Sequence, residues 1–93
     1  MILLAPESVS DTVRVRNFLE TKNPAAAVRA LRAIWKVLEL VEQHPGLGKR
    51  TRDSAIRQIA VRFGASGYVV RYTMRADGTL LVLRIWHGRE ARK

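Results

Sequence analysis

The dipeptide Asp77-Gly78 separates two apolar segments, residues 68–75 and 79–86, and it constrains the fold of this chain more than any other feature. Asp-Gly between two such segments is a strong signal for a β-hairpin with a two-residue type I′ turn. This turn type would fix the register, because Ala76 would face Thr79 and each earlier residue would face a later one in step. The C-terminal half is therefore predicted to contain two long antiparallel strands.

This register divides the hairpin into two faces. One face would be apolar almost throughout and should lie under a layer of helices; it carries Tyr68, Val70, Tyr72, Met74, Leu81, Leu83, Ile85 and His87. The other face would be mixed; it carries Val69, Arg71, Thr73, Arg75, Leu80, Val82, Arg84 and Trp86. On that mixed face Arg71 would stand directly opposite Arg84.

The N-terminal half has the pattern of two helices. Residues 2–5 form a short apolar strand, and Ser8 with Asp11 three residues later is a loose capping-box variant that predicts a helix start. Asn23 followed by Pro24 predicts the start of a second helix. Its apolar stripe, which should face the core, consists of Ala27, Leu31, Ile34, Trp35, Leu38 and Val41.

The two helices are joined by almost no linker, so they should form an antiparallel hairpin. A further strand is expected at residues 59–63, where apolar side chains alternate. The predicted order is β-α-α-β-β-β. We expect an α+β fold, in which an antiparallel sheet has the N-terminal helical hairpin packed on one face, and a single domain over residues 1–93.

Positive charge is concentrated in the second half of the chain. Residues 1–48 contain six Lys or Arg and five Asp or Glu, whereas residues 49–93 contain eleven and three. The second half thus contributes +8 of the net charge of +9. Clustered cations favour a polyanionic or acidic partner, which can be a nucleic acid or an acidic protein.

The mixed sheet face is the candidate binding surface, with Val69, Arg71, Arg84 and Trp86 on the strands and Arg89 just beyond them. Two arginines directly opposite each other destabilise a sheet by up to about 1 kcal/mol, unless an anion binds them. Arginines beside a Trp on an open face are typical of protein-binding or nucleic-acid-binding surfaces. The alternative is a solvated face whose long Arg stems cover apolar surface.

Catalytic signals are sparse. Arg62, Arg84, His87 and Arg89 could supply the cationic stabilisers and the acid or base of phosphodiester cleavage. A lone His at a strand end is also explained as a hydrogen-bonded structural group. With no cysteine and two distant histidines, neither a metal site nor a cofactor is expected. No apolar run is long enough to span a membrane, so a cytoplasmic location is the default.

Several segments in this order together resemble the RelE/ParE toxins of bacterial type II toxin–antitoxin systems. The segments are Lys22-Asn23-Pro24-Ala25-Ala26-Ala27, His44-Pro45-Gly46-Leu47-Gly48, Ala65-Ser66-Gly67-Tyr68-Val69-Val70 and Arg84-Ile85-Trp86-His87-Gly88-Arg89. The resemblance covers essentially the whole chain. It implies a small cytoplasmic growth inhibitor that is neutralised by an acidic ParD-like or RelB-like antitoxin.

The resemblance leaves two targets open. The RelE branch cleaves messenger RNA in the ribosome, and the ParE branch poisons DNA gyrase. Arg62 and Arg89 match basic positions of the nuclease branch. That branch, however, usually has an Arg at the position of Val69 and a Lys at the position of Ala60. We therefore expect a ParE-like gyrase inhibitor, with a ribosome-dependent endoribonuclease as the alternative.

Outside the family, a plain nucleic-acid-binding module would use Arg71, Arg84 and Trp86. A relative that keeps its antitoxin but has lost toxicity is a further alternative.

Overall fold

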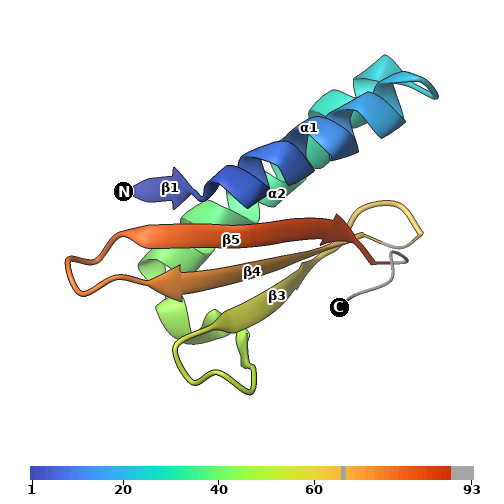
Figure 1. Cartoon of the computed structure of the whole chain (residues 1–93). Helices are drawn as coiled ribbons and strands as arrows, with labels where there is room; N and C mark the ends of the chain where they lie inside the picture. Colours follow the sequence, from blue (N-terminus) through green and yellow to red (C-terminus); the bar gives the residue numbers. More distant parts are fainter. Residues whose placement is uncertain (66, 89–93) are drawn as a thin grey trace.

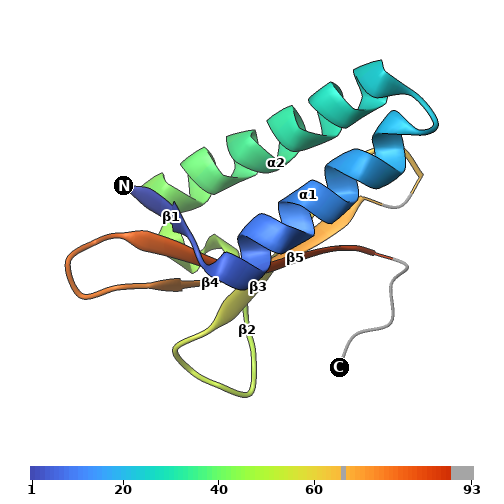
Figure 2. The ribbon, with the colours of Figure 1, turned by 45° about the horizontal axis from the view of Figure 1, so that its top comes forward.

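A computed structural model describes residues 1–65 and 67–88 of the chain. The elements follow in the order β1 (Ile2–Leu4), α1 (Pro6–Glu20), α2 (Pro24–Gln43), a 3₁₀ turn (Pro45–Leu47), β2 (Lys49–Arg50), β3 (Arg57–Val61), β4 (Tyr68–Met74) and β5 (Leu80–His87). The five strands form one sheet in the order β1-β5-β4-β3-β2. The two helices run side by side along one face of this sheet (Figures 1 and 2). The predicted α+β fold with a helical hairpin on one face is confirmed.

The sheet is mixed rather than purely antiparallel, because β1 pairs in parallel with β5. Its register places Ile2 beside Leu80 and Leu4 beside Val82. The last bond of this pairing runs from the backbone N–H of Ala5 to the carbonyl of Val82, at 2.9 Å. The chain then turns at once into α1, so β1 covers only the first part of β5.

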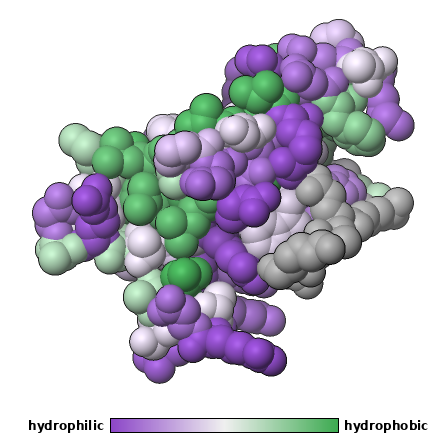
Figure 3. All heavy atoms as spheres, viewed as in Figure 1, coloured by the Kyte–Doolittle hydropathy of each residue, from purple (hydrophilic) through white to green (hydrophobic). Residues whose placement is uncertain are grey.

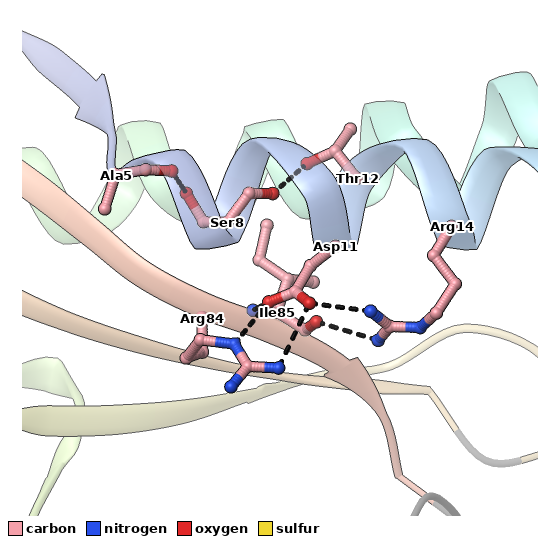
Figure 4. Close-up of polar contacts among 7 residues, drawn as sticks. All are labelled: Ala5, Ser8, Asp11, Thr12, Arg14, Arg84 and Ile85. Atoms are coloured by element: carbon pink, nitrogen blue, oxygen red, sulfur yellow. Dashed lines mark hydrogen bonds and ion pairs between the residues drawn. The ribbon is translucent and has the colours of Figure 1, made fainter.

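The start of α2 is as predicted, and the start of α1 is not. The Asn23 side chain accepts hydrogen bonds from the N–H groups of Ala25 and Ala26, at 3.0 and 3.3 Å. In α1 the cap is Ala5, and the helix begins at Pro6, whose fixed φ suits the first helical position. Ser8 lies inside the helix and donates its hydroxyl to the carbonyl of Ala5 (Figure 4).

Most of the predicted stripe of α2 is buried, as are the sheet residues beneath it. Leu31 is only half-buried, and Trp35, which was also expected in the core, is 45% exposed. The buried positions of α2 are Ala27, Ala30, Ile34, Leu38 and Val41. Trp35 follows Ile34 directly, and one residue turns the side chain by about 100° around the helix, away from that line.

The β4–β5 hairpin differs from the prediction at two places. Its loop has three residues, because Arg75 rather than Ala76 pairs with Thr79, and only Gly78 has a positive φ, at 87°. This geometry is a type I turn followed by a left-handed residue. A bulge then shifts the register back between Tyr72 and Arg71.

The two shifts offset each other toward the far end of the hairpin. From Arg71 onward the predicted register is confirmed, and Arg71 does face Arg84. Near the turn the prediction was wrong: Leu80 and Val82 are fully buried in the core, and Leu81 and Leu83 are half-buried on the opposite side. Within the described residues, no helix is long and apolar enough to cross a membrane.

Candidate binding face of the sheet

The sheet face turned away from the helices, here called the outer face, is organised in rows that run across the strands. One row consists of Ala60, Val69 and Trp86, which are cross-strand neighbours on β3, β4 and β5 and carry no charge. The adjacent row consists of Lys49, Gln58, Arg71 and Arg84, on β2 to β5. We call these the uncharged row and the cationic row.

Apolar surface adjoins these rows near the start of β5. Leu3 on β1 pairs with Leu81, and Leu3 is 40% exposed. In the view of Figure 3, green apolar side chains gather where Figure 1 places β1 and the beginning of β5. The predicted combination of apolar and cationic groups on one face is therefore present, although Leu3, Leu81 and Leu83 supply apolar surface that the predicted register gave to Leu80 and Val82.

Arg71 is held in the middle of the cationic row. Its guanidinium lies over the ring of Trp86, 5.0 Å from the ring centroid, and its Nε donates a hydrogen bond of 3.1 Å to Oε1 of Gln58. Trp86 itself is only 6% exposed, so it contributes much less open apolar surface than the sequence suggested. The Arg71 guanidinium, rather than the indole, is thus the part of this pair that a partner can reach.

Arg84 is held by an acid from α1. Asp11 accepts hydrogen bonds from Nε and Nη2 of Arg84, at 2.7 and 3.2 Å, and from Nη1 of Arg14, at 2.6 Å (Figure 4). It also accepts the backbone N–H of Ile85, at 2.8 Å. Arg14 in turn donates to the carbonyl of Ile85, at 3.3 Å. We refer to Asp11, Arg14, Arg84 and the Ile85 backbone as the Asp11 cluster.

Asp11 is 2% exposed, and its carboxylate stays charged because of its hydrogen-bond donors. Burial alone would raise the pKa of this carboxyl group. The hydrogen bonds from Arg84, the Ile85 N–H and Arg14 outweigh burial, so the pKa lies below its ordinary value. Arg84 is therefore neutralised within the molecule, which removes the main electrostatic objection to placing it opposite Arg71.

Three of the four candidate catalytic residues, Arg62, Arg84 and His87, lie in the described part of the chain. His87 pairs with the buried Tyr68 and packs edge-on against its ring, with centroids 5.4 Å apart, on the helix-facing side of the sheet. Arg84 is bound to Asp11, and Arg62 is exposed just beyond the end of β3. Arg89 lies outside the described residues.

Sequence reasoning missed Asp11, which was assigned to a helix cap. A signal for its true role was available in the helix itself, because Asp11 shares the buried side of α1 with Ser8 and Val15. An acid on the buried side of a helix needs a cationic or N–H partner from another element. Strand β5 supplies both partners, the guanidinium of Arg84 and the backbone N–H of Ile85.

Comparison with known proteins agrees with this fold. The structure titled "Chromosomal ParDE TA system from P. aeruginosa" matches with a TM-score of 0.76 over 92% of each chain, at 13% sequence identity. An α+β fold of this kind therefore occurs in the toxin class to which the sequence segments pointed.

Sequence comparison identifies the family. A family model described as "ParE toxin of type II toxin-antitoxin system, parDE" matches residues 2–92. Toxin RelE3 of Caulobacter vibrioides is 36% identical over 89 residues, which cover 96% of this chain and 95% of that toxin. Toxin RelE1 of the same organism is 32% identical over 91 residues, covering 98% and 96%. The chain thus belongs to the ParE toxin family, within the RelE/ParE superfamily of type II toxin–antitoxin toxins.

Proposed function

We propose that this toxin acts as a non-enzymatic inhibitor of DNA gyrase in the cytoplasm and is neutralised by an acidic, ParD-like antitoxin. The proposal is carried by the uncharged row. Ala60 and Val69 occupy the two positions where the nuclease branch of the superfamily usually has cations, and they are direct neighbours across β3 and β4. Their row continues into Trp86 and contains no cation at all.

Two of the remaining cations are already bound within the molecule. Arg84 is bound by Asp11, and Arg71 is bound by Gln58 and stacked on Trp86. His87 faces the core side of the sheet. Loss of a single transition-state stabiliser reduces a rate by about 10²–10³. A site that lacks two of them therefore supports binding better than cleavage.

The outer face is suited to an acidic protein partner. Arg71 offers a guanidinium that is already oriented by Trp86 and Gln58, which lowers the entropy lost when a carboxylate binds. Leu3 and the half-buried Leu81 and Leu83 beside it can pack against apolar side chains of the partner. An antitoxin segment that becomes ordered on this face would recover its ordering entropy through these contacts.

The first experiment is controlled expression of the chain in bacteria, with pulse labelling of DNA and protein synthesis in the same culture. We expect DNA synthesis to fall first while translation continues, and the purified chain to inhibit gyrase supercoiling. Arg71→Ala should weaken this inhibition, whereas Arg29→Ala, an equal loss of charge on the exposed surface of α2, should not. Normal supercoiling at saturating toxin would overturn the proposal.

The second candidate function is a ribosome-dependent endoribonuclease. It is favoured by the names of the two Caulobacter relatives, both RelE, and by the exposed Arg62. In the same culture, this function predicts that translation stops first and that translated messages are cut at codon boundaries. His87→Ala and Arg62→Ala should then abolish the cuts, and unchanged cleavage in both variants would remove these two residues from the reaction.

A further inference from the structure

A cavity of about 320 Å³ lies beside Arg57. It opens to solvent, and it is lined by the 3₁₀ turn after α2, the loop between β2 and β3, and the end of β4. Its wall is partly apolar and contains one cationic group; the residues that matter here are Pro45, Ser54, Ala55, Arg57, Thr73 and Met74.

The guanidinium of Arg57 is fixed in place by backbone carbonyls. Its Nη1 donates to the carbonyl of Gly48 at 2.8 Å and, more weakly, to that of Gly46 at 3.5 Å. Among the residues that the structure describes, its Nε and Nη2 have no hydrogen-bond partner, and no carboxylate forms an ion pair with it. Arg57 therefore presents donors to a ligand without first having to break an ion pair.

The walls of the cavity are also fixed. The hydroxyl of the fully buried Tyr72 donates to the carbonyl of Pro45 and accepts the N–H of Gly48, both at 2.8 Å. Thr73 donates its hydroxyl to the carbonyl of Ala55, which attaches the loop to β4. A ligand would thus meet a preformed site and lose less free energy to ordering of the protein.

The electrostatic surroundings favour an anion. Arg50 stands directly opposite Arg57 across β2 and β3. Residues 46–57 contain four cations and one acid, Asp53. The Asp53 side chain accepts the N–H of Ala55 and makes no ion pair with either arginine. Two adjacent cations without an internal anion repel each other, so an external anion would relieve that repulsion.

We propose that this cavity binds the carboxylate of an aliphatic acidic side chain, such as Glu, from an acidic protein partner. The forked guanidinium matches a carboxylate in two-point geometry, and Pro45, Ala55 and Met74 can contact its methylene groups. The Thr73 hydrogen is already donated, so Arg57 and Ser54 are the side-chain donors that remain. That set suits two carboxylate oxygens better than a phosphate group.

The identity of the partner as the antitoxin rests on the proposed function, but the binding site itself does not. The test is an NMR titration of the full chain with N-acetyl-glutamate amide, at constant ionic strength. N-acetyl-glutamine amide serves as the neutral control, and inorganic phosphate as the competing anion. We expect saturable shifts at the Arg57 Nε–H and at the backbone N–H groups of Ser54 and Thr73, with the glutamate probe only.

Three variants separate the cavity from general attraction to a basic surface. Arg57→Gln should weaken binding of the glutamate probe about tenfold or more, the size of a charge-assisted hydrogen-bond pair. Ser54→Phe should fill the cavity and weaken binding similarly while leaving Arg57 unchanged, so the test does not depend on Arg57→Gln folding. Arg52→Gln removes an exposed cation of the same loop and should leave binding within about twofold.

The outcomes are distinct. The cavity is not the binding site if the glutamate probe binds Ser54→Phe and wild type equally, or if its NMR shifts are spread over all exposed cations. Saturation by phosphate but not by the glutamate probe would replace the acidic protein with a nucleic-acid phosphate. Because the titration uses neither gyrase nor an antitoxin, a positive result combined with unaffected gyrase would overturn only the proposed function.

Discussion

Two pairs of arginines face each other across neighbouring strands, and they differ in the groups that bind them. In the Arg71–Arg84 pair, Asp11 binds one arginine, and Trp86 and Gln58 hold the other. In the Arg50–Arg57 pair, backbone carbonyls accept the hydrogen bonds of Arg57, and no ion pair is formed with either arginine in the described part of the chain. The Arg71–Arg84 pair thus has a carboxylate of the protein on one of its arginines, whereas the Arg50–Arg57 pair has none among the described residues.

We expect the first pair to contribute mainly to the stability of the fold and the second pair mainly to the binding of a partner. The Asp11 cluster joins α1 to β5, residues far apart in the sequence, so most of its free energy should support the fold. The Arg57 cavity has an equally ordered cation and an open volume of about 320 Å³ in front of it. Because no carboxylate in the part of the chain that the structure describes binds Arg57, its substitution should weaken the binding of an anion and change the free energy of unfolding only slightly.

The largest effect should come from Asp11→Ala. The buried N–H of Ile85 would lose its acceptor, and Arg84 would face Arg71 without its anion. Both arginines of the cluster are about half exposed, at 50% and 44%, and can be rehydrated, so we expect a loss of about 2–3 kcal/mol of unfolding free energy. Urea unfolding at neutral pH measures it.

Glu20→Ala is the matched control for Asp11→Ala, because it removes an exposed acid from the same helix. It should change stability by less than about 0.5 kcal/mol. If the two variants were equally stable, the Asp11 cluster would not hold α1 on the sheet.

A smaller loss of unfolding free energy is expected from Gly48→Ala, which crowds Tyr72 in the wall of the cavity beside Arg57. A Cβ atom at this position would lie 2.6 Å from the hydroxyl of Tyr72 and 3.0 Å from the carbonyl of Gln58. Relief of this overlap must move the buried tyrosine or the turn, at a cost of about 1–3 kcal/mol. Gly46→Ala meets no atom within 4 Å and should be tolerated. Thermal unfolding of both variants gives the comparison.

The smallest effect should be the loss of unfolding free energy at low pH that results from protonation of Asp11. The pKa of its carboxyl group is lowered in the folded protein, so its stabilising contribution is present above the unfolded value of about 3.9 and is lost as pH falls through the folded value. Protonation removes only the charge and leaves the side chain in place, so the loss should be smaller than that of Asp11→Ala.

Urea unfolding at pH 7 and pH 3, in wild type and in Asp11→Asn, isolates this contribution. The pKa of Asp77 is also lowered, chiefly by the hydrogen bond from the Thr79 N–H, but Asp77 acts equally in both proteins. The variant should therefore lose less stability than wild type on acidification. Identical losses of unfolding free energy would show that the charge of Asp11 does not contribute to stability.

Local sequence signals predicted the elements well, because each has a chemical cause within a few residues. Asn23-Pro24 sets the start of α2, and alternation sets the strands. The register near Leu80 and Val82 was not predictable, because it depends on a three-residue loop and a later bulge. The Arg71–Arg84 pairing was predicted correctly only because those two shifts offset each other.

The candidate site was predicted in part for the same reason. Arg71, Arg84, Val69 and Trp86 do lie together, since strand alternation places them there. Asp11 and the Arg57 cavity depend on contacts between distant segments, such as Asp11 with Arg84 and Tyr72 with Pro45. The spacing of Ser8, Asp11 and Val15 indicates that Asp11 is buried, but no spacing in the sequence identifies the partner of Asp11 or of Tyr72.

The attachment of α1 to β5 has a consequence for how this protein avoids self-association. A strand edge with free N–H and C=O groups is a template on which another chain can add a strand, and β1 covers only the first part of β5. Asp11 and Arg14 occupy the N–H and C=O of Ile85 further along that edge. Two side chains of one helix thus take the place of a missing strand and close the edge of β5 to polymerisation.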